Sequence, residues 1–281
     1  MTTLDQFESV FKSAVKSVYQ HQPVSINSAM LITDLSQNEA NSFAAQVRQL
    51  LTSQQISNWQ ILHNEQYSTT SDLLDLAGSD DLDLICCYRN LCSEAWRHPH
   101  SLGSYLDVLI QRTATPVLVL PHPEAGYAWE SAYSETRRVL AMTDHMTEDD
   151  RLVSYAAAFS SDQLFLAHIE DEGTFERYVD AISKITSIDT PSAAAAIRHE
   201  LLKHPTDYIA SCQAVLSDIF PGLAVDPIVA YGHKLTDYLS HVQERDINLL
   251  VMHGKQKDQL AMHGLSYPLA IELRQIPLLI I

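Results

Sequence analysis

The sequence predicts an α/β protein built from two tandem doubly wound domains, each with an open parallel sheet, preceded by an amphipathic helix. One pattern occurs twice, about 160 residues apart, over 81–121 and 245–281. In each copy an apolar run precedes a loop, a glycine, an amphipathic helix and a proline followed by consecutive aliphatic residues. Elsewhere apolar runs alternate with helical patterns of ten or more residues, which is typical of parallel sheets covered by helices on both faces. A length of 281 residues suits two such domains.

Breaks in these patterns place the domain boundaries. We expect an N-terminal helix within 1–22, a first domain over 23–122 and a second domain over 137–281. Prolines and a glycine within 121–126 interrupt the pattern and open the linker. The N-terminal helix is predicted over 3–20 because apolar residues recur there on one helical stripe: Leu4, Phe7, Val10, Phe11, Ala14, Val15 and Val18.

In the first domain, the sequence predicts four strands and three helices in alternation. The strands are short apolar runs bounded by turn residues, at 29–36, 59–68, 82–89 and 116–121. The helices repeat apolar residues at helical spacing, at 37–51, 69–78 and 102–112. This set of elements is small for an independent domain.

In the second domain, the sequence predicts five strands. They are expected at 138–146, 163–170, 223–232, 248–254 and 276–281. Helices are expected over 148–159, over 234–245 and before the last strand. About 50 residues before the third strand have helical character, and there Thr190 and Pro191 are predicted as the N-cap and the first helical residue.

The composition excludes several classes of protein. The formal net charge is −17 and both halves are acidic, so nucleic acid or an anionic membrane would meet net repulsion. No apolar stretch reaches the length of a membrane span, and charged residues near the N-terminus exclude the apolar centre of a signal peptide. Four cysteines without metal-ligand spacing are typical of a reducing compartment. We therefore expect a cytoplasmic protein.

The second domain resembles the universal stress protein domain nearly end to end. The resemblance rests on the opening strand with Asp144, on AAAFSSDQLFLAHIED, on YGHKLTDYLSHVQERDINLLVMHG and on the closing GLSYPLAIELRQIPLLII. The first domain matches at AMLITDLS, at DLDLICCYR and at GSYLDVLIQRTATPVLVLP, and lacks one strand–helix segment. The resemblance implies a tandem universal stress protein with open five-stranded sheets, similar to nucleotide-binding hydrolase-like domains.

ATP-binding members of this family carry G-x2-G-x9-G-[S/T] after the fourth strand, where glycines let the backbone approach phosphates. Gly254 and Gly264 keep the x9 spacing, but Val251 replaces the first glycine. Leu265 stands at the Ser/Thr position and Ser266 follows one residue late. We therefore expect degenerate nucleotide sites without a bound cofactor. The alternative is an ATP or AMP sensor that uses only the second domain, through Asp144, Val229, Gly254, Gly264 and Ser266.

In the first domain, Gly103 and Ser104 match the end of this motif, but Ser93 stands ten positions upstream of Gly103. Both residues also fit the start of an ordinary helix, with Ser104 as N-cap. Asp34 and Asp144 follow the first strand of each domain, where the resemblance implies an aspartate near the base and ribose. Helix capping explains these aspartates equally well, and both explanations stay open.

No catalytic or metal site is expected. The histidine pairs His98 with His100 and His253 with His263 have no cysteine or carboxylate at ligand spacing. Nothing resembles a nucleophile elbow or a Ser–His–Asp order, so no enzyme activity is expected. A hydrolase on the same sheet would need a polar cluster at the strand ends that the sequence does not display.

The last strand of each domain is an aliphatic run that would attract pairing if it lay at an edge. We expect these two strands to meet within one chain, and a homodimer to form through the N-terminal helix. The predicted function is a non-catalytic stress-response or regulatory protein that acts on unidentified protein partners.

Overall fold

A computed structural model describes residues 17–78, 82–97, 100–143, 146–147, 149–254 and 264–281. Its strands are β1 (Ser28–Ile32), β2 (Asn58–Leu62), β3 (Leu84–Tyr88), β4 (Val117–Leu120), β5 (Arg138–Met142), β6 (Gln163–Asp171), β7 (Ala224–Gly232), β8 (Leu249–Met252) and β9 (Leu278–Ile280). Its α-helices are α2 (Gln37–Leu50), α3 (Thr70–Ala77), α4 (Ser104–Arg112), α5 (Asp150–Phe159), α6 (Glu172–Ser183), α7 (Thr190–Ile219), α8 (Lys234–Glu244) and α9 (Ser266–Glu272). Three short 3₁₀ helices are η1 (Thr52–Gln54), η2 (Glu94–Arg97) and η3 (Glu130–Tyr133).

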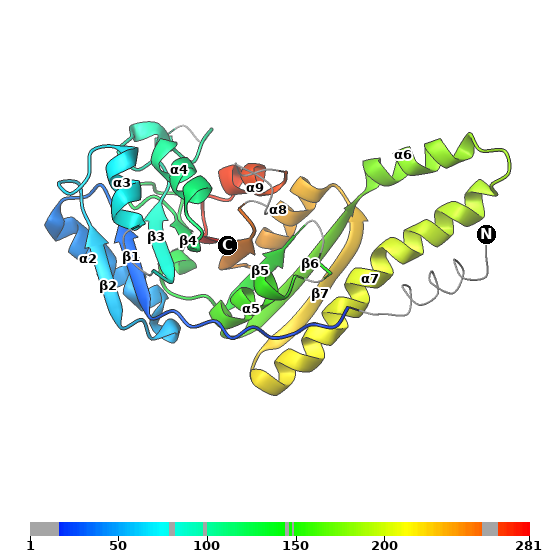
Figure 1. Ribbon diagram of the computed structural model, residues 1–281, viewed down its shortest axis with the longest axis horizontal. Coiled ribbons are helices and arrows are strands. Elements are labelled where there is room, and N and C mark those ends of the chain that lie inside the picture. Colours follow the sequence, from blue (N-terminus) through cyan, green and yellow to red (C-terminus); the bar gives the residue numbers. More distant parts are fainter. Residues whose placement is uncertain (1–16, 79–81, 98–99, 144–145, 148, 255–263) are drawn as a thin grey trace.

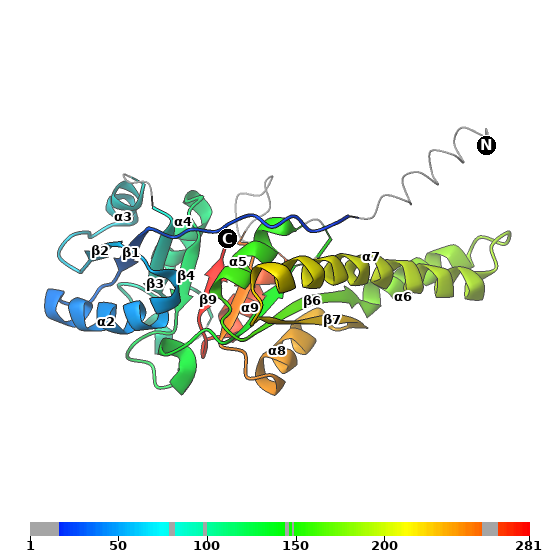
Figure 2. The ribbon, with the colours of Figure 1, turned by 90° about the horizontal axis from the view of Figure 1, so that it is seen from below.

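The strands form one sheet in the order β2-β1-β3-β4-β9-β8-β5-β6-β7, with helices on both sides (Figures 1 and 2). All neighbouring strands are parallel except β4 and β9, which are antiparallel. The predicted α/β class with a doubly wound, mostly parallel sheet is therefore confirmed.

The sheet has two halves of similar design. The second half, β5 to β9, places its strands in the order third, second, first, fourth, fifth. The first half, β1 to β4, follows the same order without a counterpart of β7. In each half the chain changes direction across the sheet beside its first strand, between β1 and β3 and between β5 and β8. The carboxyl ends of strands at such a switch point are where ligands bind in doubly wound sheets.

The two halves join through their last strands. Val117 pairs with Ile280 and Val119 pairs with Leu278, and all four side chains are buried. These are the two aliphatic runs that we expected, from the sequence, to pair within one chain. Because β4 and β9 are antiparallel, the carboxyl ends of the first half lie at the edge where the strands of the second half begin.

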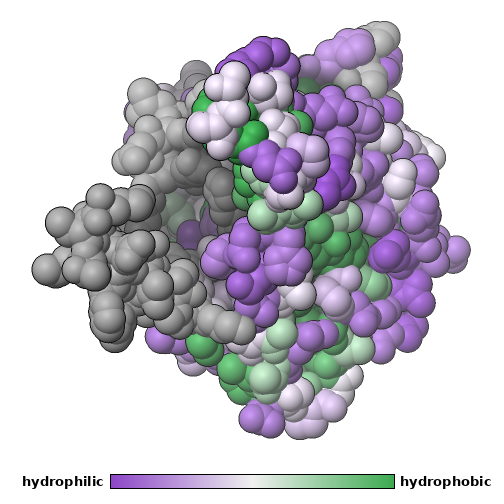
Figure 3. All heavy atoms as spheres, turned by 90° about the vertical axis from the view of Figure 1, so that its right-hand side faces the viewer, coloured by the Kyte–Doolittle hydropathy of each residue, from purple (hydrophilic) through white to green (hydrophobic). Residues whose placement is uncertain are grey.

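The helical stretch of the second half forms a projecting arm made of α6 and α7 (Figure 1). The Arg198 guanidinium fixes the base of this arm, because its carbon lies 4.2 Å from the Tyr231 ring centroid and 4.7 Å from that of Phe175. Arg198 also forms an ion pair with Glu172. Figure 3 looks at the arm end and shows hydrophobic patches between hydrophilic side chains. Within the described part of the chain, no helix combines the length and apolar character that a membrane crossing needs.

The start of α7 differs from the prediction by one residue. Asp189 holds the N-cap position, Thr190 begins the helix and Pro191 follows as its second residue. Proline is tolerated at both of the first two positions, because neither backbone N–H has a partner within the helix.

The predicted N-terminal helix lies mainly outside the described residues. Residues 17–20 are described and have no helical structure, so the prediction is wrong for them. Tyr19 explains this, because its buried side chain anchors the segment between α5 and α7. Its hydroxyl lies 2.8 Å from the Ser154 hydroxyl, and its N–H donates to the Ser211 hydroxyl at 2.9 Å. Tertiary contacts thus replace local helical bonds here.

Candidate functional site

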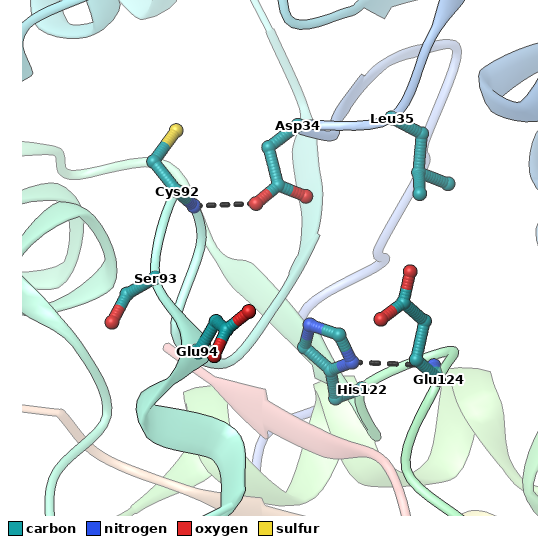
Figure 4. A pocket seen from close by; sticks show the side chains of 7 residues that line it. All are labelled: Asp34, Leu35, Cys92, Ser93, Glu94, His122 and Glu124. Atoms are coloured by element: carbon teal, nitrogen blue, oxygen red, sulfur yellow. Dashed lines mark hydrogen bonds between the residues drawn. The ribbon is translucent and has the colours of Figure 1, made fainter.

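A cavity of about 310 Å³ lies at the switch point of the first half (Figure 4). It collects side chains from the segments that follow β1, β3 and β4, at the carboxyl ends of the strands. Its lining consists of Asp34, Leu35, Cys92, Ser93, Glu94, His122 and Glu124. This is the edge at which a doubly wound sheet binds its ligands.

Asp34 faces this cavity and is held by its own chain. Its carboxylate accepts hydrogen bonds from the Tyr88 hydroxyl and from the Cys92 backbone N–H, the latter at 2.5 Å. The following helix begins after Ser36, whose N–H donates to the Glu39 carboxylate at 3.2 Å. A helix N-cap role for Asp34 is therefore wrong, because Ser36 caps α2, and the Asp34 carboxylate instead holds the loop after β3.

Gly103 occupies the N-cap position of α4 with a φ of +92°, and Ser104 is the exposed first residue of the helix. The predicted N-cap at Ser104 is thus wrong by one residue. A Cβ at Gly103 would lie 2.7 Å from the Asn90 Cα. The Asn90 N–H also donates to the Leu102 carbonyl at 2.8 Å. Glycine is required here because the chain's own loop packs against it.

The loop after β3 reaches this position through two residues in the left-handed region. Asn90 and Cys92 both have a φ of +58°. Asparagine tolerates this conformation better than most residues, whereas cysteine is uncommon there. The bonds to Asp34 and Leu102 offset the strain and hold the loop in the space beside the start of α4.

The electrostatics of the cavity are acidic. Among the described residues that line it are the carboxylates of Asp34, Glu94 and Glu124, and none of these described residues is a lysine or arginine. Burial lowers the pKa of His122, although the charges of Asp34 and Glu124 act in the opposite direction. The His122 Nδ1 accepts a hydrogen bond from the Glu124 backbone N–H at 3.2 Å. A neutral imidazole therefore adds no positive charge to the cavity.

Cys92 contributes a thiol rather than a thiolate to this region. Burial raises the pKa of Cys92, and the charge of Asp34 adds to the effect. A thiol in this state is a weak nucleophile, since the thiolate is the reactive form.

The switch point of the second half has different residues. The His253 Nε2 lies 2.7 Å from the Asp149 carboxylate, which also caps α5 by accepting the Leu152 N–H at 3.2 Å. The Gly254 N–H donates to the Ile281 carbonyl at 3.2 Å. Asp144 and residues 255–263 lie outside the described residues.

The other predicted residues of the second half are only partly brought together. Gly264 has a φ of +61° and stands just before α9, which begins at Ser266. Val229 lies on β7 and pairs with His168 of β6. Because β5 and β6 separate β7 from β8, the structure does not place Val229 beside Gly254.

Sequence reasoning missed the role of Arg89. This side chain is 2% exposed, and it donates to the carbonyls of Ala270 and Leu273 at the C-terminal end of α9. Burial lowers the pKa of Arg89 to about 10. The partial negative charge at a helix C-terminus suits a buried cation. The available signal was an arginine directly after a fully apolar strand.

Sequence reasoning also missed Glu94, His122 and Glu124. The signal for His122 and Glu124 was their position within four residues of the last aliphatic residue of β4, at the same edge as Asp34. No group of three or more histidine, cysteine, aspartate or glutamate side chains in the described part of the chain could hold a metal ion. His98 and His263 lie outside the described residues.

Comparisons with known proteins find similarity only among solved structures. No protein-family model matches the sequence. No curated protein matches it either. A universal stress protein from Archaeoglobus fulgidus DSM 4304 is 12% identical, with a TM-score of 0.50, and the match covers 92% of this chain and 97% of that chain.

Two further structures match with a TM-score of 0.50 and 11% identity. A putative universal stress protein from Pseudomonas aeruginosa UCBPP-PA14 is matched over 91% of this chain and 93% of that chain. A functionally unknown protein from Pseudomonas aeruginosa PAO1 is matched over 91% and 92%. The resemblance seen in the sequence is thus confirmed as a likeness of fold: over nearly its whole length, this chain has the fold of universal stress proteins.

Proposed function

We propose that this protein is a non-catalytic stress-response or regulatory protein with two degenerate nucleotide sites, which acts through contacts with protein partners in the cytoplasm. The observation that carries the proposal is the state of the backbone N–H groups at the two switch points. Phosphate cradles in such folds are made of unpaired N–H groups beside a helix start. Here the N–H groups of Asn90, Cys92 and Gly254 already donate to acceptors within the chain.

The charge of the first cavity supports the same conclusion. A nucleotide polyphosphate would bring several negative charges into a space lined by the carboxylates of Asp34, Glu94 and Glu124. Like charges at a distance of about 4 Å repel each other by several kcal/mol at the effective dielectric of a protein surface. The main chain of Asn90 also stands where glycine-rich loops let phosphate approach.

Unfolding of the purified chain with and without magnesium ATP tests this proposal. A ligand at 100 times its dissociation constant would raise the free energy of unfolding by about 2.7 kcal/mol. We expect no such rise with ATP or AMP that depends on Gly264, and no hydrolysis of either nucleotide. A saturable rise that disappears in Gly264→Ala would contradict the proposal, since it would place a nucleotide at the second switch point.

The stress role has its own test in cells. Loss of the chain should reduce survival under stress, and the wild type should restore it. We expect Asp34→Asn to restore survival as well, because the proposal gives the first cavity no ligand-binding role. Sedimentation of the chain with and without residues 1–16 tests the proposed homodimer, which should require these residues, and this truncation keeps Tyr19 in place.

A second candidate function is a sensor of ATP or AMP in the second half alone. The observation in its favour is Gly264, which has a positive φ of +61° and immediately precedes Leu265, the N-cap of α9. If this candidate is right, nucleotide stabilises the wild type and Ser104→Ala alike, and fails to stabilise Gly264→Ala and Ser266→Ala.

A further inference from the structure

Three hydrogen-bond donors lie unpaired between the two halves of the sheet, where Arg89 and Tyr127 approach the C-terminal end of α9. We call this region the seam. The Nε atoms of Arg89 and Arg274 and the hydroxyl of Tyr127 are buried, and within the described residues they have no hydrogen-bond partner. Buried polar groups in native proteins nearly always have a partner, so each of these donors needs an explanation. All three can donate, and none of these arginine atoms can accept.

The three groups are neighbours although they come from distant segments. The Arg89 Nη2 donates at 2.5 Å to the carbonyl of Leu273, the residue next to Arg274. The guanidinium carbon of Arg274 lies 5.1 Å from the Tyr127 ring centroid. Tyr127 and Arg274 both influence the pKa of Arg89, in opposite directions. The Trp129 N–H donates to the Gln275 carbonyl at 3.0 Å and fixes the linker against this seam.

The charge at this seam is opposite to that of the molecule. The chain has a formal net charge of −17, yet two guanidinium groups meet here. Neither Arg89 nor Arg274 has an ion-pair partner in the part of the chain that the structure describes. Leaving a buried cation such as Arg89 without a counter-charge is costly, whereas Arg274 is only partly buried. Arg89 is compensated in part by the carbonyls at the end of α9, and the guanidinium of Arg274 lies against the face of Tyr127.

We propose that a small oxyanion, such as inorganic phosphate or the phosphate group of a larger molecule, binds in this seam between Arg89, Arg274 and Tyr127. Guanidinium groups match the geometry of phosphate oxygens, and a phenol hydroxyl supplies a further donor. An oxyanion accepts from all three donors and neutralises the two cations, which a water molecule does not do. The site is separate from the switch points, because Tyr88 and Arg89 are consecutive at the end of β3 and point to opposite faces of the sheet. The inference therefore does not depend on the proposed function.

Titration of the full-length chain with inorganic phosphate tests the proposal. The chain is first dialysed into a phosphate-free buffer, and sodium chloride at matched ionic strength serves as the reference. We expect a saturable rise in the thermal midpoint and one phosphate per chain by calorimetry. Arg274→Gln should weaken phosphate binding by about tenfold or more, because it removes a charge-assisted hydrogen bond.

Two further variants separate binding from folding. Tyr127→Phe keeps the ring under Arg274 and removes only the hydroxyl, so it should weaken phosphate binding severalfold without loss of folding. Arg112→Gln removes an exposed arginine from the end of α4 and should leave phosphate binding unchanged. If phosphate gives no rise in the wild type, or the same rise in Arg274→Gln, the seam holds only water and the proposal fails.

AMP in place of phosphate distinguishes the two sources of the oxyanion. Stabilisation by AMP that depends on Arg274 would place the phosphate group of a larger molecule in the seam. Stabilisation by AMP that depends instead on Gly264 would count against the proposed function and would leave the seam to the phosphate titration.

Discussion

β3 and β8 are equivalent strands of the two halves, but the residues that follow them make different contacts. Each strand is buried and lies next to a switch point, and a glycine with positive φ stands at or just before the start of the helix that follows it. After β3 come Arg89 and Asn90, and after β8 come His253 and Gly254. Arg89 reaches across to α9 of the other half, whereas His253 pairs with Asp149 of its own half.

This difference shows that two halves can keep the same fold while the residues that follow their strands differ. The strands and helices depend on the pattern of buried apolar residues, which both halves keep. The residues that follow the strands need not be apolar. They can therefore bind a ligand, connect the two halves or fill space without altering the sheet. In the first half Arg89 bonds to the other half, and Asn90 packs against Gly103 at the start of α4.

The largest effect is expected for Arg89→Met. Methionine preserves much of the volume but leaves the carbonyls of Ala270 and Leu273 without their charged donor. We expect a loss of about 3 kcal/mol in the free energy of unfolding, measured with urea. Arg112→Met, at an exposed site, should change it by less than about 0.5 kcal/mol. Equal losses in both variants would show that Arg89 does not hold the halves together.

The two glycines with positive φ should respond unequally to alanine. Gly103→Ala adds a Cβ at 2.7 Å from the Asn90 Cα in addition to backbone strain, so we expect a loss of about 3 kcal/mol. Gly264→Ala should cost about 1 kcal/mol for the left-handed conformation of this residue.

Gly126→Ala is the matched control for these two variants. A Cβ there meets no atom within 4 Å, so we expect little change in the urea midpoint. A loss for Gly103→Ala no greater than that for Gly264→Ala would mean that the loop at Asn90 yields easily and does not block the first switch point.

The smallest effect concerns pH and His122. Because burial lowers the pKa of His122, the unfolded chain binds this proton at a higher pH than the folded chain does. The free energy of unfolding should therefore fall as pH drops below about 6.5 and continue to fall through the folded-state pKa. Urea unfolding at about pH 7.5 and about pH 5.5 should show a smaller acid loss for His122→Gln than for the wild type. Identical losses would show that His122 is not desolvated in the first cavity.

Sequence reasoning predicted most elements because their signals are local. The aliphatic runs after Pro116 and Pro277 became β4 and β9, and the helical spacing over 37–51 became α2. A strand buried on both faces must be apolar throughout, so a continuous run is informative without knowledge of its neighbours. The helix starts at Ser104 and Thr190 were each misplaced by one residue, since neighbouring polar residues compete for the N-cap position.

By itself, the sequence determined the α/β class, the order of the elements and the repeat that produces two similar halves. It could do so because the spacing of apolar residues along the chain reflects which residues are buried. Only the tertiary structure decided that Arg89 bonds to α9, that Asp34 fastens the loop after β3, and that Tyr19 is anchored between α5 and α7. These contacts join residues more than 50 positions apart. Their partners depend on which distant backbone the folded sheet brings within hydrogen-bonding distance, and no local pattern encodes that choice.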